Sequence, residues 1–477
     1  MGLVIDKSML HRITLQIWGA AALQVTLTKN LYSMNGTWSY DNVTIGSVLR
    51  LKTDDNETAG PAALRSRCDI AAFGAKAGNS TSFAPANAAA FALAMAQCER
   101  VVVPAGQAFK IAPVVILSHR TLELQAGSAL VASDDWRDYG VTRFMPPMGR
   151  AMQLKPMLSA VNATNISILG ANGTLDGNGW FAWPTANWSS AECGVHRRCA
   201  GPTFFGLPAQ KLRPPHVLTF IRCTDVSIEN VTVTNPPYWG VQHFYCNRST
   251  ISNVTILAPR WTREIAGLMP WSVLDYSVSD SFVHVGDDAL AVMSGADEAG
   301  RLWPTSRLVF RRLFVRGRSV AFGSADSGNV TDVLFDDCTI GDDSGSSPWA
   351  VKFKMHVNVA SHISGVVFRD CRFGNISANS WQDPTPYPAI QTSTNYGEAA
   401  VDLANGQPSI FNISFVNVSA AATGTAGSFV GASQSSISAL HFQGCRFRST
   451  ARKPWLLTNV SVSSCTSQDT TPPFPVQ

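Results

Sequence analysis

Two adjacent acidic residues, Asp287 and Asp288, are the strongest candidates for chemistry in this sequence. They lie in the segment VGDDALAV (residues 285–292), at a place where most of the related segments of the chain have a turn. Hydrolysis of a glycosidic bond with inversion uses a carboxylic acid that protonates the leaving oxygen and a carboxylate that activates water, about 6.5–9.5 Å apart. Adjacent side chains on an ideal strand point to opposite faces, so both acids reach one groove only if the chain bends at Gly286.

The side-by-side placement also affects the pKa values of these two carboxyl groups. Two like charges this close raise the pKa of at least one of them, which a general acid near neutral pH requires. The alternative, and the commoner case for a bare Gly-Asp-Asp, is an exposed acidic turn without a catalytic role. The surrounding sequence has to decide between these two interpretations.

Short strand patterns with one layout recur from about residue 160 to the C-terminus, and they would position these acids. Residues 224–233 (TDVSIENVTV) are echoed by residues 249–256 (STISNVTI), so Asn230 and Asn253 hold equivalent places 23 residues apart. The pattern returns in residues 276–285, 306–315, 329–340, 363–373, 410–418 and 437–447. Apolar and polar residues alternate in each unit, as in a strand with one buried face. Stacking of such units predicts an all-β fold, a right-handed parallel β-helix.

The cysteines of the repeats fall at equivalent positions. Cys223 and Cys246 each lie seven residues before the equivalent asparagines, so successive turns stack their sulfur atoms, which either pair or fill the core as small apolar groups. Cys338, Cys371 and Cys445 likewise share one position in their repeats.

Two further cysteines lie close together in a loop. Cys193, His196 and Cys199 have a spacing that supplies half of a metal site, but the sequence shows no second half. A disulfide between Cys193 and Cys199 is therefore the preferred interpretation, and it suits an oxidising compartment. We expect neither a metal nor another cofactor.

One segment, residues 83–98, predicts a helix because it is rich in Ala, Leu and Met. We expect this helix to cap the N-terminal end of the coil, where apolar side chains would otherwise be exposed. Residues 28–67 show no sustained periodicity and are interpreted as a leader or partly ordered arm. The main domain is predicted to cover residues 68–477.

Composition and charge exclude several classes of protein. Hydrophobic residues make up 45% of the chain and charged residues 15%, which indicates a globular protein rather than a disordered one. The formal net charge is +4 and no basic run stands out, so nucleic acid is not an expected partner. A locally basic groove for an acidic ligand remains open, and we expect a monomer.

Residues 1–27 are predicted to be a secretory signal. The apolar run 13–27 follows Lys7 and Arg12 and is too short for a comfortable membrane span, which makes a membrane anchor the second choice. Sixteen Asn-x-Ser/Thr sequons fit a secreted chain, although a β repeat also favours such strings. We expect a secreted protein, extracellular or in a cell wall, with no other membrane segment.

Six further motifs occur in order along the chain. They are CDIAAFGAKA (68–77), VVVPAG (101–106), GTLDGNGW (173–180), RPPH (213–216), VTILAP (254–259), and GDD (286–288) followed by SGADEAG (294–300). Jointly they resemble glycoside hydrolase family 28, the polygalacturonases, and within it the plant exo-polygalacturonase type, over roughly residues 68–450. The resemblance implies a β-helix and metal-free inverting hydrolysis of α-1,4 links in a polymer that contains galacturonic acid.

The resemblance also implies roles for individual acids. Asp287 takes the place of the family's general acid, and Asp288 that of one of two carboxylates that position and activate water. The second belongs in the family's NTDGID motif, which corresponds to residues 264–269 (EIAGLM), where Ala266 replaces the Asp. A methyl group can neither orient nor deprotonate water. Glu264, two residues earlier and so on the same face of an extended strand, is a candidate to reach the water site instead.

Four further residues are candidates for substrate binding by the same resemblance. The family's GHG motif corresponds to residues 317–319, where Arg318 replaces the His, which exo-type relatives also lack. Its RIK motif corresponds to residues 352–354, where Lys352 replaces the Arg and Lys354 is retained. Tyr396 looks like the tyrosine that packs against the sugar at the cleavage subsite.

The two lysines are expected on one face of a strand. Val351, Phe353 and Met355 alternate with them and would point inward. Two ammonium groups on one face suit the carboxylate of a uronic acid, although Lys in place of Arg gives up bidentate geometry. The alternative is a pair of solvated lysines.

Two functions from different classes follow. The first is a secreted polygalacturonase-like hydrolase of an acidic polysaccharide. The second is a catalytically impaired relative that binds carbohydrate or serves as a structural protein of the cell wall, because Ala266 replaces a carboxylate. A calcium-dependent pectate lyase on a similar coil fits less well, since it would need metal-bound substrate.

Overall fold

The computed structural model describes residues 12–17, 23–28, 33–34, 37–38, 64–142, 152–179, 212–260, 262, 265–297, 300–341, 347–356, 360–376, 387–394, 407–431 and 436–476. The chain divides into two compact units, residues 1–63 and 64–477. In the first unit, strands β1 (Arg12–Ile17) and β2 (Leu23–Thr28) pair antiparallel, as do β3 (Ser33–Met34) and β4 (Thr37–Trp38). The signal peptide and the domain boundaries stay predictions.

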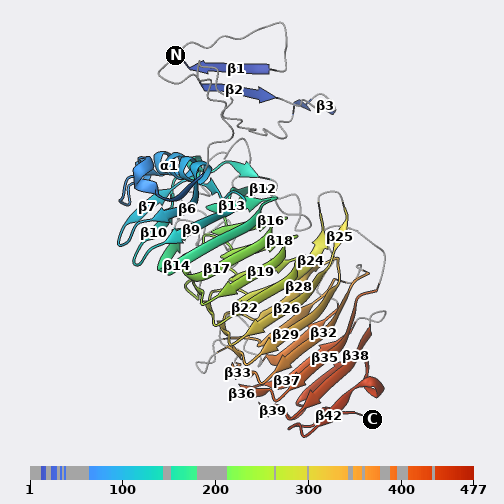
Figure 1. Ribbon diagram of the computed structural model, residues 1–477. Coiled ribbons are helices and arrows are strands. Elements are labelled where there is room, and N and C mark those ends of the chain that lie inside the picture. The colour runs from blue at the N-terminus through green and yellow to red at the C-terminus, as the bar shows by residue number, and fades with distance from the viewer. Residues whose placement is uncertain are drawn as a thin grey trace, which may run out of the picture. The chain divides into compact units, whose positions relative to one another are not determined.

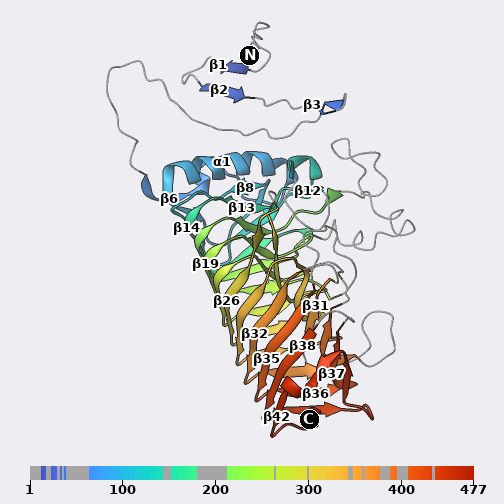
Figure 2. The same ribbon diagram turned by 90° about the vertical axis from the view of Figure 1, so that its right-hand side faces the viewer.

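The second unit is a parallel β-helix, as the repeats predicted, and its strands stack turn upon turn from blue to red in Figures 1 and 2. Two large, mainly parallel sheets form its walls, and the strands that pair in parallel within them come from successive turns. We call them the long sheet and the site sheet. Each turn of the coil therefore covers the apolar face of the previous one.

In the described residues the long sheet has 23 strands, namely β5 (Arg65–Asp69), β6 (Cys98–Val103), β7 (Ala108–Ile111), β9 (Arg120–Leu124), β10 (Ala129–Ala132), β14 (Thr164–Asp176), β17 (Thr224–Thr234), β19 (Asn247–Ser252), β20 (Thr255–Leu257), β22 (Leu274–Ser279), β23 (Phe282–His284), β26 (Thr305–Arg311), β27 (Phe314–Arg316), β29 (Val330–Asp336), β30 (Thr339–Ile340), β32 (His362–Arg369), β33 (Arg372–Asn375), β35 (Ser409–Val416), β36 (Ser419–Thr423), β38 (Ser436–Gln443), β39 (Arg446–Ser449), β41 (Val460–Ser461) and β42 (Thr466–Gln468).

The site sheet has 12 strands in the same residues, namely β8 (Val114–Val115), β13 (Leu158–Val161), β16 (Leu218–Ile221), β18 (Val241–Phe244), β21 (Leu268–Trp271), β24 (Leu290–Ala296), β25 (Leu302–Trp303), β28 (Val320–Asp326), β31 (Val351–Lys354), β34 (Pro388–Ser393), β37 (Thr425–Val430) and β40 (Trp455–Thr458). A small third sheet comprises β11 (Val141–Thr142), β12 (Met152–Leu154) and β15 (Leu212–Arg213).

Helix α1 (Ala84–Gln97) lies close to the predicted position, at the blue end of the coil in Figures 1 and 2. Its role as a cap stays a prediction. Short 3-10 helices span Ile70–Phe73, Thr81–Phe83, Trp136–Asp138 and Val462–Ser464. In the part of the chain that the structure describes, no helix has both the length and the apolar character needed to cross a membrane.

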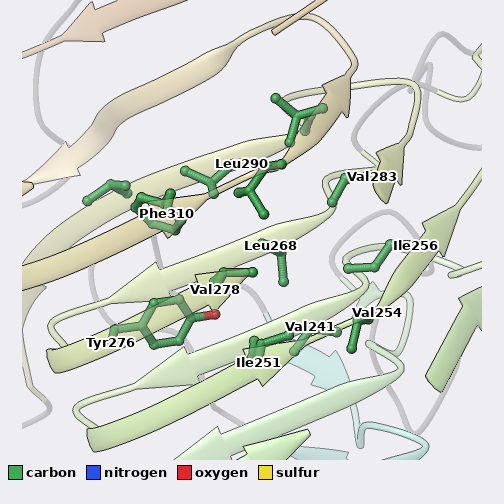
Figure 3. Packing of buried hydrophobic residues seen from close by; sticks show 14 of the residues in the cluster. Val241, Ile251, Val254, Ile256, Leu268, Tyr276, Val278, Val283, Leu290 and Phe310 are labelled. Atoms are coloured by element: carbon green, nitrogen blue, oxygen red, sulfur yellow. The ribbon is translucent and has the colours of Figure 1, made fainter. Parts of the chain in front are cut away.

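The core fills the lumen between the two sheets. Figure 3 shows Val241, Leu268 and Leu290 of the site sheet packed in one cluster with residues of the long sheet, Ile251, Val278 and Phe310 among them. Five phenylalanines of the long sheet stack on successive turns with centroid separations of 4.6, 4.6, 5.2 and 5.1 Å, namely Phe310, Phe335, Phe368, Phe415 and Phe442. Such stacking fixes the register of the turns, because a slipped strand would turn its rings toward solvent.

The turn positions also follow the predicted repeat. Asn230 and Asn253 hold equivalent places in neighbouring turns, both with positive φ (57° and 51°), and the amide of Asn253 donates a hydrogen bond to Oδ1 of Asn230. Asparagine tolerates this left-handed conformation better than most residues.

The structure shows whether the cysteines of the repeats are paired, and it contains one disulfide that was not expected. Cys223 and Cys246 are buried free thiols that fill the core, as are the three cysteines of the later repeats. A disulfide joins Cys68 and Cys98, whose Cα atoms are 6.0 Å apart, and this bond was not predicted. The predicted Cys193–Cys199 bond lies outside the described residues.

Candidate active site

The two acids are separated by one residue from the N-terminal end of β24, a central strand of the site sheet. Asp287 N donates to the carbonyl of Ile265, and Asp287 O accepts from Arg318 N at 2.8 Å, so both neighbouring turns hold this segment. Gly286 matters here for a reason other than the predicted bend. A Cβ at this position would lie 1.7 Å from the carbonyl oxygen of Thr262, so only glycine allows the two backbones to approach this closely.

Asp288 is held at both carboxylate oxygens. Ser319 Oγ donates to Oδ1 and Lys354 Nζ donates to Oδ2, each at 2.5 Å. The side chain of Asp288 is 13% exposed, so the carboxylate is largely desolvated but still reaches solvent. A charged, doubly hydrogen-bonded carboxylate of this kind has a fixed orientation.

Asp287 has a different set of polar neighbours. Its Oδ1 accepts a hydrogen bond of 2.8 Å from the backbone N–H of Asp288. The guanidinium of Arg318 lies 3.5 Å from the same oxygen, and the carboxyl side chain is 15% exposed. Arg318, one of the predicted residues, is therefore a neighbour of Asp287.

The two carboxyl groups are shifted in opposite directions. Burial raises the pKa of Asp287, the negative charge of Asp288 adds to the rise, and nearby cations do not cancel it. Burial would also raise the pKa of Asp288, but the charge and hydrogen bond of Lys354 outweigh it and lower that pKa overall, with help from Ser319. Divergent pKa values in one carboxylate pair give one group that can donate a proton and one that stays ionised.

Lys352 and Lys354 face the outside of the site sheet together, while Val351, Phe353 and Met355 are fully buried in the lumen. Lys354 meets Asp288. Lys352 instead lies over the ring of Trp349, with its Nζ 3.7 Å from the ring centroid.

The indole ring of Trp349 contacts two of the predicted cationic side chains, Arg318 and Lys352. The guanidinium of Arg318 lies 5.7 Å from the centroid of the indole that also carries Lys352, and the ring of Tyr387 lies 4.7 Å away. Burial and the charge of Lys354 lower the pKa of Lys352 to about 7. This ammonium group is therefore poised to lose its proton near neutral pH.

Ala266 lies next to Asp288 on the other side. Leu268 pairs with Leu290, so two residues earlier Ala266 is in register with Asp288, and Gly267 N donates to the carbonyl of Asp288 at 3.2 Å. The methyl group is buried in an apolar cluster with Met269 and others. The side from which a second water-binding carboxylate was expected thus presents a hydrocarbon surface at position 266.

Two predicted residues, Glu264 and Tyr396, lie outside the described residues, so their roles stay predictions. Three residues of the site were not predicted from the sequence, namely Ser319, Trp349 and Tyr387. Ser319 belongs to the same motif as Arg318, and Trp349 precedes strand β31 by two residues. Their position next to recognised motifs is the feature of the sequence that could have identified these two residues.

The arrangement can perform acid and base chemistry on a bound anion. Asp287 retains a proton more readily than an ordinary aspartate, Asp288 remains ionised, and three cations surround the pair. Among the residues that the structure describes, no cluster of three or more His, Cys, Asp or Glu side chains is arranged to hold a metal ion.

Sequence comparisons place the chain among known proteins. It is 28% identical to a probable polygalacturonase of Vitis vinifera over 326 residues, which cover 64% of this chain and 61% of that protein. An exo-poly-alpha-D-galacturonosidase of Dickeya chrysanthemi is 24% identical over 405 residues, with coverage of 77% and 64%. In both cases the match spans less than two thirds of the relative's length.

Solved structures support the same fold. An exopolygalacturonase of Thermotoga maritima superposes with a TM-score of 0.65 at 18% identity, covering 86% of this chain and 92% of that one. A polygalacturonase of Erwinia carotovora gives 0.64 at 19% identity, covering 85% and 99%. The sequence profile of Glycosyl hydrolases family 28 matches residues 118–466, which include every described residue of the site, and the chain therefore belongs to that family.

Proposed function

We propose that this chain is a secreted hydrolase that cleaves α-1,4 links in a polysaccharide containing galacturonic acid, with inversion at the anomeric carbon. The observation that carries the proposal is the divergence of the two carboxyl groups. Asp287, with its raised pKa, protonates the leaving oxygen, and Asp288, held ionised by Lys354, takes the proton of the attacking water.

The cations explain the choice of an acidic sugar. Lys354 compensates Asp288 and Arg318 lies against Asp287, while Lys352 adds a third positive charge to a site with two acids. With Asp287 protonated and Asp288 paired with Lys354, the remaining positive charge would attract a uronate carboxylate. Secretion rests on the predicted signal and sequons, and its first test is detection of the mature chain outside the cell.

The proposal is tested by release of reducing ends from polygalacturonate. Proton NMR of the first product should show the β anomer from an α-linked substrate, which distinguishes inversion from retention. Asp287→Asn should reduce release about 10²–10⁴-fold. Activity that depends on a divalent cation and yields an ultraviolet-absorbing unsaturated product would indicate a lyase instead and contradict the proposal.

A second candidate function rests on Ala266. Because the position in register with Asp288 presents a buried methyl group, a carbohydrate-binding protein without efficient turnover is the alternative. Ala266→Asp separates the two. Wild-type turnover that exceeds that of Asp287→Asn supports the hydrolase, whereas binding on glycan arrays, with hydrolysis only in Ala266→Asp, supports the binding protein.

A further inference from the structure

Ser319 is a buried hydroxyl aimed at a reacting group. Its side chain is 3% exposed, and Oγ lies 2.5 Å from Oδ1 of Asp288. The carbonyl of Ser319 accepts a hydrogen bond of 2.9 Å from Ala289 N, so its backbone is tied to the strand that follows the acids. The hydroxyl therefore has little freedom to point elsewhere.

The contacts around Asp288 are one-sided. Ser319 and Lys354 reach it from the turns that follow β24 in the sheet. On the turn that precedes β24, the residue in register is Ala266, whose methyl group offers no hydrogen bond. Whatever fixes the rotation of this carboxylate among the described residues must come from the side of Ser319 and Lys354.

We propose that Ser319 is a positioning residue for the proposed hydrolysis, which fixes the Asp288 carboxylate in the orientation that binds water in a site without a carboxylate at position 266. Ser319 neither gives up nor accepts a proton in the reaction. Its donated hydrogen bond stabilises the ionised form of Asp288 and leaves the remaining lone pairs of both oxygens for the attacking water. The inference rests on the proposed function for its kinetic consequences, but not for its effect on Asp288 itself.

The charged groups that face Asp288 are Lys354 and Lys352 from β31, Arg318 from the turn before β28, and Asp287 beside it. On the β21 side the register neighbour, Ala266, carries no charge. None of these charges changes in Ser319→Ala, so a shift in the titration of Asp288 reports the lost hydroxyl.

The experiment compares Ser319→Ala, Ser319→Thr and Ser294→Ala on the full chain. Ser294 of β24 is a matched control, because its buried hydroxyl donates to the carbonyl of Gly328, which follows β28, and has no hydrogen bond to either acid. Ser319→Ala should lower kcat about 10-fold, as expected when a hydrogen bond to a charged group is lost. KM should change little, and the acid limb of the pH profile should move to higher pH.

Ser319→Thr keeps the hydroxyl and should restore both kcat and the acid limb. Wild-type kcat in Ser319→Ala, an equal loss in Ser294→Ala, or failure of a folded Ser319→Thr to recover would overturn the proposal. Melting temperatures of all variants show whether each is folded.

A second measurement needs no turnover. Titration of the aspartate carboxyl carbons by carbon NMR in the substrate-free protein, with Asp288→Asn to identify the signal, should give a higher pKa for Asp288 in Ser319→Ala than in the wild type. An unchanged pKa overturns the role of Ser319. Absence of hydrolysis by the wild type, together with a raised pKa in Ser319→Ala, overturns the proposed function and leaves the positioning role standing.

Discussion

The two flanks of the acid pair in the site sheet differ sharply in chemistry. On the side of the preceding turns, the outer face of the sheet has an apolar cluster in which Ala266, Met269 and Trp271 are buried, beside the amide of Gln242. On the side of the following turns it is cationic, with Lys352 and Lys354 on one strand. Yet the backbone is the same on both sides, since all of these residues lie in successive turns of one sheet.

One row of the sheet shows how the change occurs. Ala291 is paired with Ala321, and Ala321 is paired with Lys352, so a single step along the row replaces a methyl group with an ammonium group. The β-helix thus fixes where the side chains lie, whereas the type of side chain at each position varies independently from turn to turn. The difference teaches that the later turns supply both the positive charge for the proposed acidic substrate and the groups that hold Asp288.

The largest effect should come from replacing Asp287, which lies between the apolar and the cationic side of the sheet. Asp287→Asn removes the proton donor and should reduce the rate of reducing-end release about 10²–10⁴-fold, the usual contribution of general acid catalysis. Asp225→Asn, which breaks an exposed ion pair with Arg248 on the long sheet, is the control and should retain wild-type turnover. Equal rates for Asp287→Asn and wild type would remove Asp287 from the mechanism.

Lys354→Met should have the next largest effect and tests the cationic flank directly. Loss of its ion pair and hydrogen bond leaves burial to dominate at Asp288, so the pKa of that carboxyl group rises. Because the proposed reaction needs ionised Asp288, the acid limb of the pH profile should move to higher pH in this variant. The value of kcat should also fall about 100-fold, as for loss of an effective base.

The control for this variant is Lys110→Met, which removes a lysine that is also buried and paired, 3.2 Å from Asp134, but outside the site. It should lower the melting temperature and leave the pH profile unchanged. A similar acid-limb shift in both variants would show that the profile follows stability rather than Asp288.

The sequence predicted the coil well because its evidence is repeated. The alternation of apolar and polar residues recurs in many turns, and the register follows from stacked residues such as Asn230 and Asn253. The sequence also predicted that Lys352 and Lys354 share a face, since a strand period of two requires it. The structure has both lysines on the outer face, with their neighbours in the lumen.

The side-chain partners within the site were less predictable. That Lys352 lies on Trp349 whereas Lys354 meets Asp288 depends on side-chain reach across turns, which no periodicity encodes. The role of Gly286 was interpreted as a bend, but the carbonyl that excludes a Cβ belongs to Thr262, 24 residues earlier. The Cys68–Cys98 bond was missed because the repeat does not extend to these two cysteines.

The turns that precede the acids also carry a titratable group that faces the lumen, and this group predicts a stability effect. His243 lies on β18, fully buried, stacked 4.7 Å from Phe220, and neither ring nitrogen has a hydrogen-bond partner in the described residues. Burial lowers the pKa of His243 to about 3. In the unfolded chain His243 binds a proton with a pKa near 6.5, whereas in the folded chain it does so only near pH 3. The stability of the fold is therefore fully present above pH 6.5 and is lost progressively as the pH falls toward 3.

At pH 5 this linkage costs about 2 kcal/mol, from 1.36 kcal/mol for each of about 1.5 pH units. His243→Leu should therefore be less acid-sensitive than the wild type, as measured by urea unfolding at pH 7.5 and at pH 5. The pH 7.5 values provide the internal control, because packing changes appear there as well. An identical loss of unfolding free energy between the two pH values in both proteins would exclude His243 as a source of acid sensitivity.

The smallest effect concerns binding of the substrate carboxylate by the cationic flank. Because the pKa of Lys352 is lowered to about 7, its ammonium group is charged below that pH and neutral above it. KM for oligogalacturonates should therefore rise as the pH passes through 7, by up to about 10-fold for one charge-assisted contact. Lys352→Arg should remove this rise, since a guanidinium keeps its charge. Trp349→Phe, which retains an aromatic face for the cation, should resemble the wild type. A wild-type KM that stays constant with pH would show that Lys352 does not contact the substrate carboxylate.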